Sequence, residues 1–531
     1  MKEYLKERRP ELAMLTFFSL ISTMLGVRIQ FVKGDILDIA IYGGKSNLWA
    51  MIMLLLVLIA LEMGTFYFFD LFRAKYAVGN NRKLRKSFFM SLFKLSPIAI
   101  QNKKSGEYIA QYTNESDMVL GGYFGVIPLL IEIIIKIIIV SVSLFWLDAS
   151  IAVLTLFLLT TPLYVPKLVE GRLQKAQRRN VEAFEKHLSK VMEWLSGFEL
   201  IRHFSMTNVV EKQFDESISE VLDASYQAKK LAAMSRVLSG LLSYLSHFII
   251  LAVAAFFVAN KKFSAGKFFV AVSMIDQLSY PIISLSMYIK DLVSSKEVAE
   301  KFIKNIDERL GMNSDSKQGL EECVRQVQFE KVSFSYGEDT LIRDFNLELQ
   351  SGEKCLIMGA SGSGKSTLMN LLLGYYQPSD GRVCVNEIES EDIGNLNYHI
   401  AVMRQEPFLF SDTLRNNLTM YREIDDERLV EMLKRLRLDK FASKEALDKM
   451  ITENGNNLSG GEKKRISLAR VLLSDASILI LDEPLANVDG DTVSKIEDII
   501  VEIEDKILFV VTHQFDEEKK KVFDKQVQLV H

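Results

Sequence analysis

Residues 359–367 form a glycine-rich segment, GASGSGKST, whose residue types and spacing suit phosphate binding. It follows the short apolar stretch KCLIMG and precedes the apolar stretch LMNLLLGYY, which is the strand–loop–helix order of a phosphate-binding loop. Glycines let backbone N–H groups surround phosphate oxygens, and the start of a helix favours negative charge. We expect Lys365 to contact the β- and γ-phosphates of a nucleotide and Ser366 to bind Mg²⁺. The loop residues predicted to bind nucleotide are Gly359, Ser361, Gly362, Ser363, Gly364, Lys365, Ser366 and Thr367.

Two acidic residues follow a second apolar stretch, Ile478–Leu481, which we predict to be a buried strand. A carboxylate at the carboxyl end of such a strand can hold Mg²⁺, directly or through water, so Asp482 is the candidate metal ligand. The next residue, Glu483, is the candidate for polarising the attacking water. An apolar stretch that ends in two acids is weak evidence alone. Together with the phosphate loop it predicts nucleotide hydrolysis.

Three further side chains are candidates for the same site because they lie beside predicted strands. His513 follows residues 507–512 and is expected near the γ-phosphate. Gln405 follows the apolar segment IAVM, where it would sense Mg²⁺ and the attacking water. Tyr336 lies near a strand end, where its ring would stack on a base. A lone glutamine or histidine is usually a surface or core residue, and a buried structural role for Tyr336 stays open.

The segment LSGGE, residues 458–462, is the most discriminating motif in the chain. Ser459 and Glu462 have the spacing of a capping box, so a helix is predicted to begin there and to run through KKRISLARVLL. The N-terminus of such a helix attracts anions. Because the phosphate loop already serves the chain's own nucleotide, Ser459, Gly460 and Gly461 are expected to close on the nucleotide of a partner subunit. An ordinary capped helix would explain the cap but not the paired glycines.

The first half of the chain contains apolar stretches that are too long for a soluble fold. A helix needs about 20 apolar residues to cross the hydrocarbon core of a bilayer. Lysine and arginine concentrate between the second and third stretches and between the fourth and fifth, which places both termini and both long loops in the cytosol. These polar loops are expected to extend the neighbouring helices into the cytosol. The six predicted spans are approximately 12–32, 48–71, 124–147, 151–166, 237–259 and 268–292.

Several ionisable residues lie inside or near these spans. Charged side chains in a membrane usually face the interior of a bundle or a wet cavity. Glu132 and Lys136 are one helical turn apart and could pair with each other. Both a structural ion pair and the polar wall of a substrate cavity remain open, whereas His247 is expected to be a packed, hydrogen-bonded residue. The ionisable residues in question are Arg28, Glu62, Asp70, Glu132, Lys136 and Asp276.

The sequence pattern changes after the sixth span. Residues 311–319 have the small, polar composition of a linker. Beyond them, short β-rich stretches alternate with helical ones, which predicts a mainly parallel sheet beside an antiparallel piece around VQFEKVSFSY. The formal net charge of −4 gives no support for nucleic-acid binding. Cys323, Cys355 and Cys384 match no zinc or redox spacing and are expected to be free, buried thiols.

The motifs and their order resemble the ATP-binding cassette (ABC) transporter family, and the resemblance covers nearly the whole chain. The phosphate loop, Gln405, LSGGE, ILILDE and His513 are similar to that family's Walker A, Q-loop, signature, Walker B and H-loop. The resemblance to exporter-type half-transporters implies an all-α polytopic membrane domain with six transmembrane helices and long cytosolic extensions. It implies that an α/β P-loop ATPase domain with an antiparallel β subdomain and a helical subdomain follows. The implied domains are 1–305, a linker at 306–322 and a nucleotide-binding domain at 323–531.

Single positions match or depart from the family pattern. Tyr336 resembles the aromatic residue that stacks on adenine, and residues 105–117 resemble the first cytosolic coupling segment. Glu462 replaces the more frequent glutamine, which should matter little because either side chain can close the capping box. Asn487–Asp489 stands where Ala-Leu-Asp is more usual; Asp489 is retained, so communication between subunits is implied.

The resemblance implies a dimer that binds ATP and Mg²⁺ at its interface. Each nucleotide would lie between Lys365, Asp482 and Glu483 of one subunit and Ser459 and Gly461 of the other. ATP binding would close the dimer and reorient the substrate cavity, and hydrolysis would reset it. Both a homodimer and a heterodimer with a second half-transporter remain open.

The expected function is ATP-driven transport across the plasma membrane of a bacterium, with both termini and the nucleotide-binding domain in the cytosol. Membrane lipid surrounds the spans, and no nucleic acid is involved. Export of a drug, lipid or small peptide is favoured. The alternatives are uptake of a siderophore-like compound, an ATP-gated channel or regulator, and a soluble ATPase of the DNA-repair type. The six apolar stretches argue against the last of these.

Overall fold

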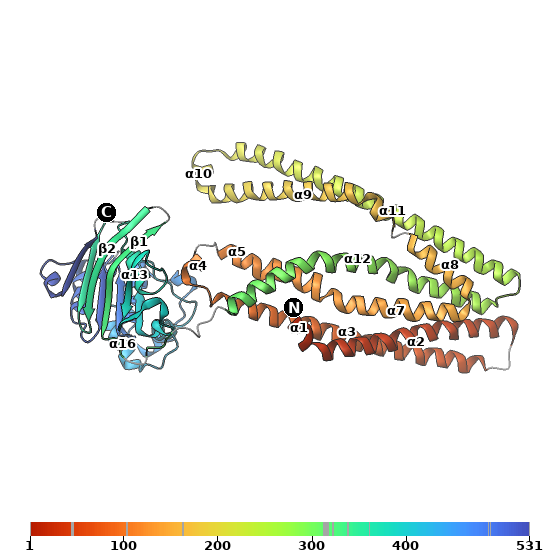
Figure 1. Ribbon diagram of the computed structural model, residues 1–531, viewed down its shortest axis with the longest axis horizontal. Coiled ribbons are helices and arrows are strands. Elements are labelled where there is room, and N and C mark those ends of the chain that lie inside the picture. The colour runs from red at the N-terminus through yellow and green to blue at the C-terminus, as the bar shows by residue number, and fades with distance from the viewer. Residues whose placement is uncertain are drawn as a thin grey trace. The chain divides into compact units, whose positions relative to one another are not determined.

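The structure is a computed structural model that describes residues 2–43, 47–101, 105–161, 164–311, 318–320, 323–336, 339–360, 362–486, 488 and 490–529. The chain divides into two compact units. The first is Met1–Lys94 with Lys103–Leu310, and the second is Leu95–Asn102 with Gly311–His531. Helices build the first unit, whereas the strands all belong to the second (Figure 1). The mainly helical membrane domain followed by an α/β domain, expected from the sequence, is therefore confirmed.

Long apolar helices dominate the first unit. At about 1.5 Å per residue, the 45-residue α3 and the 53-residue α11 are more than twice as long as a hydrocarbon core of about 30 Å. Among the described residues, five helical segments are long and apolar enough to cross a membrane, and Ala149–Thr160 is a shorter apolar helix. The helices here are α1 (Lys2–Glu7), α2 (Arg9–Tyr42), α3 (Leu48–Leu92), α5 (Ser105–Ala110), α6 (Ser116–Met118), α7 (Val126–Leu147), α8 (Ala149–Thr160), α9 (Tyr164–Ser196), α10 (Phe198–His203), α11 (Thr207–Ala259) and α12 (Ala265–Leu310).

The fourth expected span, 151–166, needs correction. In the structure α8 ends at Thr160 and α9 begins at Tyr164, while Pro162 lies outside the described residues. Pro166 falls in the first turn of α9, where a missing N–H breaks no helical hydrogen bond. With 12 residues, α8 is about 18 Å long, so it needs the start of α9 to cross a bilayer. Six spans therefore stay a prediction.

The expected linker at 306–322 also begins too early. Helix α12 continues to Leu310, and Ile306 is buried among Phe302, Ile303 and Ala299. A helix whose last turns pack against an apolar cluster has no reason to end at residue 305, because ending there would expose these side chains. Helix α12 ends only at Leu310, so a linker can start no earlier than residue 311.

One junction fixes the start of α12 against α2. Asp38 of α2 accepts hydrogen bonds from Ser264 Oγ and from the backbone N–H of Gly266, both at 2.6 Å, and so caps the helix from a distant part of the chain. The two backbones approach closely because both contact residues are glycines. A Cβ at Gly266 would collide with the carbonyl oxygen of Gly34, and one at Gly34 would lie 2.9 Å from that of Gly266.

The second unit contains two sheets. The antiparallel sheet has the order β2-β1-β4-β5, and the parallel sheet has the order β6-β7-β8-β3-β9. All residues of β7 and β8 are buried, as expected for central parallel strands with both faces covered. The strands are β1 (Gln326–Tyr336), β2 (Asp339–Gln350), β3 (Lys354–Gly359), β4 (Asp380–Val385), β5 (Ile388–Glu389), β6 (Ile400–Met403), β7 (Ile478–Asp482), β8 (Ile507–Val511) and β9 (Lys525–Leu529). The helices of this unit are α4 (Pro97–Gln101), α13 (Lys365–Leu372), α14 (Leu396–His399), α15 (Leu414–Thr419), α16 (Asp426–Arg435), α17 (Lys444–Leu447), α18 (Gly460–Leu472) and α19 (Gly490–Val501).

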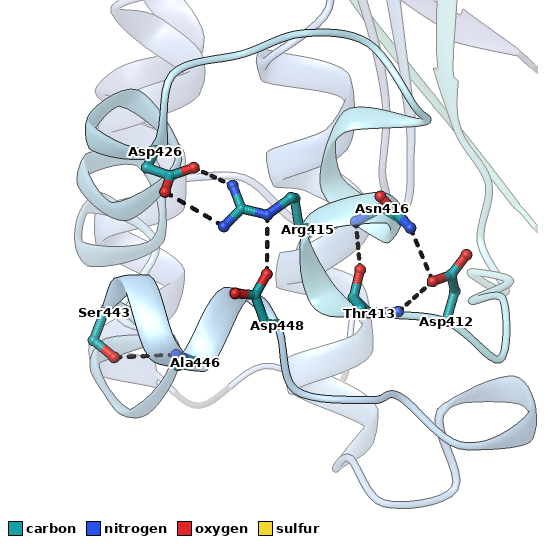
Figure 2. A network of polar contacts seen from close by, with 8 residues as sticks. All are labelled: Asp412, Thr413, Arg415, Asn416, Asp426, Ser443, Ala446 and Asp448. Atoms are coloured by element: carbon teal, nitrogen blue, oxygen red, sulfur yellow. Dashed lines mark hydrogen bonds and ion pairs between the residues drawn. The ribbon is translucent and has the colours of Figure 1, made fainter.

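Polar contacts tie together the short helices that lie between β6 and α18. Arg415 of α15 makes ion pairs with Asp426 at the start of α16 and, at 3.1 Å, with Asp448 after α17 (Figure 2). The hydroxyl of Thr413 accepts from Asn416 N and caps α15. One guanidinium thus joins three segments of the expected helical subdomain, whose buried core includes Leu414, Leu429, Leu433 and Leu447.

We predict that Gly266→Val destabilises the helix bundle by about 1–3 kcal/mol, because the added side chain forces α2 and α12 apart. Gly64→Val in α3 is the matched control, since a Cβ there meets nothing within 4 Å. Thermal unfolding of the detergent-purified protein should show a clear loss for the first variant only. Equal midpoints would show that the close contact contributes nothing.

Candidate functional site

Three neighbouring strands end at the same edge of the parallel sheet and bring the sequence motifs together. Strand β8 lies between β3 and β7, and Val511 is in register with both Ile357 and Asp482. The carboxyl ends of parallel strands form the usual binding edge of an open sheet. The phosphate loop, the two acids and His513 directly follow these strands, so they reach this edge from three separate parts of the chain.

A cavity of about 380 Å³ lies at this edge. Its walls contain most of the residues that the sequence analysis assigned to the nucleotide. They are Tyr336, Gly362, Gly364, Lys365, Ser366, Thr367, Gln405, Asp482, Glu483 and His513, together with Leu341. Gly359 and Ser363 belong to the same loop, whereas Ser361 and Asp489 lie outside the described residues.

The phosphate loop has a backbone that requires glycine. Gly364 has a φ of +93°, and a Cβ there would lie 3.2 Å from the side chain of Leu341. A Cβ at Gly359 would lie 2.8 Å from the carbonyl oxygen of Leu529. The Ser363 hydroxyl is buried and has no hydrogen-bond partner among the described residues. Glycine is therefore needed here for shape, not only for flexibility.

Lys365 is held in a way that suits an anion. Its ammonium donates to the carbonyl oxygens of Gly359 at 2.7 Å and Ala360 at 2.8 Å, and it forms no ion pair with any described residue. A buried ammonium that only neutral carbonyls contact retains its full charge to attract a ligand. A phosphate group therefore fits this loop by charge and by shape.

Asp482 supplies the carboxylate that a cation would need. The side chain is buried at the end of β7, and this burial raises its pKa; Arg404 and Lys365 oppose the effect, and Glu483 adds to it. A bound divalent cation would stabilise the ionised carboxylate in the same place. The oxygen donors of Asp482, Ser366 and Gln405 line one cavity and suit Mg²⁺ by type.

Glu483 is held in an unusual backbone conformation. Its φ of +52° is left-handed, a region that costs a residue with a Cβ about 1–2 kcal/mol. Its N–H donates to Val511 O at 2.8 Å, and its carbonyl accepts from Lys464 Nζ at 3.2 Å. The carboxylate points at the cavity, where Oε1 lies 3.2 Å from His513 Nε2. Such strained residues concentrate at functional sites, where the surrounding structure holds them.

Tyr336 lies at the mouth of the cavity. Half of its surface (49%) is exposed, while its hydroxyl lies 3.3 Å from Thr367 Oγ1. Its ring makes an edge contact with Tyr376 at a centroid distance of 5.7 Å, and the hydrogen bond to Tyr336 raises the pKa of Tyr376 to about 12. The structure thus positions an aromatic ring with an accessible surface beside the phosphate loop.

The LSGGE segment does not line this cavity. It forms the predicted capping box at the start of α18: Ser459 Oγ accepts from Glu462 N, and Glu462 Oε2 accepts from Ser459 N. In a helix start of this kind the first two helical N–H groups, here those of Gly460 and Gly461, have no partner within the helix. Both glycines reach the surface. Their N–H groups can donate hydrogen bonds to an anion other than the one that the chain's own phosphate loop would bind.

Lys440 neutralises the acid in this cap. Its ammonium lies 2.5 Å from Glu462 Oε1. Burial acts to raise the pKa of Glu462, but the hydrogen bonds from Lys440 and from the backbone of Ser459 hold that pKa below its ordinary value. Glutamate at this position therefore closes the cap, as expected. It also places a negative charge beside the exposed N–H groups, and Lys440 compensates that charge.

Sequence reasoning missed four residues around the site: Lys464, Lys440, Arg404 and Tyr376. One of them carried a readable signal, because Lys464 is buried and lies three, four and seven residues before the buried Ser467, Leu468 and Val471 of α18. A lysine on the apolar face of a helix requires a buried acceptor. The other three depend on contacts between distant segments and leave no local pattern.

Comparison with known proteins agrees with the fold and the motifs. Residues 12–282 match the family model for the ABC transporter transmembrane region, and residues 342–486 match the model for the ABC transporter. The lactococcin-G-processing and transport ATP-binding protein LagD of Lactococcus lactis is 27% identical over 80% of this chain, which spans 62% of that relative's length. A putative multidrug export ATP-binding/permease protein of Bacillus subtilis, YgaD, is 27% identical over 81% of this chain and 76% of its own length.

A solved structure of a bacterial Atm1-family ABC exporter with ATP bound has a TM-score of 0.77 to this chain, with 19% identity, and the match covers 99% of this chain and 94% of that one. This likeness supports the exporter fold. The transmembrane model alone matches more than half of the chain, and the ABC transporter model matches the segment that supplies most of the residues lining the cavity. The chain therefore belongs to the ABC transporter family and joins that family's transmembrane region to its transport-driving ATPase domain.

Proposed function

We propose that the protein uses ATP hydrolysis to export a hydrophobic or amphipathic compound, such as a drug, lipid or small peptide, across a bacterial plasma membrane. The observation that carries the proposal is the convergence of the phosphate loop, two acids, Gln405 and His513 on one cavity. The described residues of the chain's other unit include five apolar helices of membrane length. The relative named for multidrug export supports the direction, and the one named for lactococcin-G processing and transport supports a transport role. The distribution of positive charge supports a cytosolic position for both termini and the ATPase domain.

The residues of the cavity divide the work by their chemistry. The loop N–H groups and Lys365 bind the phosphates, and Tyr336 stacks on the adenine ring. Mg²⁺, held by Ser366, Asp482 and Gln405, would neutralise part of the phosphate charge. These roles need no rearrangement of the strands, because all of these groups already line the same cavity.

Glu483 has the role of polarising the attacking water. Its carboxylate is buried, lies at the cavity and faces His513, so it can accept a hydrogen bond from a water molecule placed there. The direction of the carboxylate depends on the left-handed backbone at Glu483. Lys464 and Val511 hold that backbone on both sides, which makes Lys464 a positioning residue for hydrolysis.

A dimer completes the site. The free N–H groups of Gly460 and Gly461 lie outside the chain's own cavity, so the nucleotide that they would bind belongs to another subunit. ATP shared across such an interface shifts the equilibrium between open and closed dimers by the difference in its affinity for the two states. A homodimer satisfies this arrangement with two equal sites, and a heterodimer with a related half-transporter satisfies it equally.

Uptake by the same architecture is the alternative direction. Vesicle orientation separates the two: an exporter accumulates its substrate in inside-out vesicles with external ATP, whereas an importer does not.

The shared site predicts an ATP-dependent cross-link between subunits. In a Glu483→Gln background, which should bind ATP but lose most turnover, cysteines introduced by Ser363→Cys and Ser459→Cys should form an intermolecular disulfide with Mg·ATP, visible as a doubled mass on a non-reducing gel. Each cysteine alone is the control. A monomer that hydrolyses ATP at full rate, or a dimer whose cross-linking ignores ATP, would contradict the proposal.

Lys464→Met should lower kcat about tenfold or more while nucleotide affinity changes less than about threefold, because the change frees the Glu483 backbone without touching the phosphate loop. Lys464→Arg should recover much of the activity, since it can still donate to the carbonyl. Lys506→Met is a matched control: Lys506 Nζ also donates to backbone carbonyls, those of Ser474 and Ala476. If both methionine variants lose turnover equally, Lys464 is merely structural.

Lys440→Met should weaken ATP-driven turnover about twofold to fivefold, because it leaves the charge of Glu462 uncompensated beside the N–H groups that receive a phosphate. Glu462→Gln alone should have little effect, since the amide still closes the cap. The double variant should regain the activity that Lys440→Met loses. Steady-state kinetics of the wild type, the two single variants and the double variant measures the coupling energy between Lys440 and Glu462. Additive losses would show that the two residues act independently.

A further inference from the structure

A second cavity lies inside the helical unit, far from the ATPase chemistry in sequence. It has a volume of about 390 Å³, within the range of pockets that hold one small organic molecule. Its walls come from α2, α3, α7 and α12, and all four helices belong to the same compact unit. The parts of the helices that line it fall within the apolar stretches expected to span the membrane. Any polar group here is therefore placed where water is scarce.

Among the described residues, the polar side chains that line this cavity have no hydrogen-bond or ion-pair partner. Ser19 is only 3% exposed and its hydroxyl lacks a hydrogen bond. Within the part of the chain that the structure describes, no side-chain hydrogen bond or ion pair is made by Glu62, Glu132, Lys136 or Gln277 either, although all four line the same space. Unpaired polar and charged groups inside a bundle are expensive. Their concentration around one cavity indicates a ligand that supplies the missing partners.

The other ionisable residues of the spans behave differently. Asp70 pairs with Arg73 at 2.8 Å, and Asp276 lies 2.8 Å from His247 Nε2, so His247 is hydrogen-bonded as expected. Arg28 is exposed and does not line the cavity. The expected pair between Glu132 and Lys136 is not formed within 4 Å. Of these ionisable residues, the half-buried ones that form no ion pair with a described residue are Glu62, Glu132 and Lys136, and all three line the cavity.

The balance of these charges favours a cation. Two carboxylates, Glu62 and Glu132, face one ammonium, Lys136, so the lining carries an excess of one negative charge when all three are ionised. The carboxylate of Glu62 lies against the backbone of α2 at Gly26, where a Cβ would lie only 2.8 Å from Glu62 Oε1. Any larger residue at position 26 would displace the carboxylate from this place.

The remaining wall is apolar and aromatic. Met63, Phe66 and Phe69 of α3 lie on the same cavity as the carboxylates. Aromatic faces attract cations, and the thioether of methionine adapts to irregular apolar groups. A ligand matched to this lining has one positive charge and an apolar or aromatic body.

We propose that the cavity among α2, α3, α7 and α12 is a binding site for a lipophilic organic cation, with Glu62 and Glu132 as the residues that recognise its charge. The inference rests on the proposed transport function and names the substrate class for it. Ser19 and Gln277 offer additional hydrogen bonds to a polar substituent, and α3 contributes the apolar contact.

The test uses the full-length protein in lipid nanodiscs and two probes of the same shape and opposite charge, tetraphenylphosphonium and tetraphenylborate. Radiolabelled tetraphenylphosphonium should bind saturably to the wild type, and tetraphenylborate should compete at least about tenfold less well. Empty nanodiscs give the partition into lipid. Equal competition by the anion would overturn the assignment, because charge would then play no part.

Three substitutions sharpen the result. Glu62→Gln and Glu132→Gln should each weaken tetraphenylphosphonium binding about tenfold, while Lys136→Gln should strengthen it several-fold because it removes the opposing charge. A gain of affinity cannot come from misfolding, so Lys136→Gln keeps the test decisive even if a glutamate variant is unstable. Asp276→Asn, a carboxylate of the same bundle outside the cavity, should leave binding unchanged. Unchanged affinity in both glutamate variants and in Lys136→Gln would refute the proposal.

Basal Mg·ATP hydrolysis by the wild type distinguishes a failure of the cation-site proposal from a failure of the proposed transport function. Robust hydrolysis with charge-independent probe binding removes the cation site and leaves the transport ATPase standing. Absent hydrolysis in the same nanodiscs removes the proposed function itself.

Discussion

The nucleotide site depends on one geometric constraint, which is that β3, β8 and β7 run parallel and end together. The register that pairs Val511 with both Ile357 and Asp482 decides how far each motif reaches beyond the sheet. A shift of one residue would turn each side chain to the opposite face, so a slipped β7 would withdraw Asp482 from the cavity. Continuous burial of β7 and β8 on both faces resists such a slip. The chemistry is local, but its precision comes from the packing of two apolar strands.

The charges around the membrane-domain cavity lack the partners that buried charges have in the ATPase unit. In the ATPase unit, Lys464 and Lys506 donate to backbone carbonyls, and Arg470 donates to the carbonyls of Asn417 and Phe408. Each of these charges pins a loop or a turn to a helix or strand. In the helical unit, Glu62 and Glu132 have no such partner among the described residues. Removing a charge from water is costly unless something pairs with it. The contrast inside one chain argues that the unpaired groups are kept for a ligand.

The part of the fold predictable from sequence was the part with short-range signals. The phosphate loop and the capping box at Ser459 and Glu462 are set by residues within a few positions of one another, and the apolar spans by residue type alone. The fourth span was harder, since its length depends on whether α9 continues α8 beyond Pro162. The end of α12 depended on the packing of Ile306, which lies among residues far away in the chain.

The candidate site shows the same division. Which residues carry the chemistry followed from motif order, because glycines, a lysine and acids at fixed spacing have few other uses. How those residues are held did not follow. The pairing of Lys440 with Glu462 joins two separate segments, and the unusual φ of Glu483 becomes interpretable only once its carbonyl is seen to accept from Lys464. The sequence specifies the groups that react, whereas the supporting contacts depend on tertiary structure.

Helix α18 connects the two halves of the proposed mechanism within a single subunit. Its N-terminus presents the free N–H groups of Gly460 and Gly461, and Lys464, one turn further on, holds the backbone of Glu483. A 13-residue helix moves as a rigid rod on the scale of one turn, so a partner's phosphate that pulls on its N-terminus also acts on the Glu483 carbonyl. Because Glu483 occupies a strained conformation, a small displacement of Lys464 changes the direction of its carboxylate. Binding of ATP at one interface site would thereby adjust hydrolysis at the other, through two contacts and no relay across the sheet.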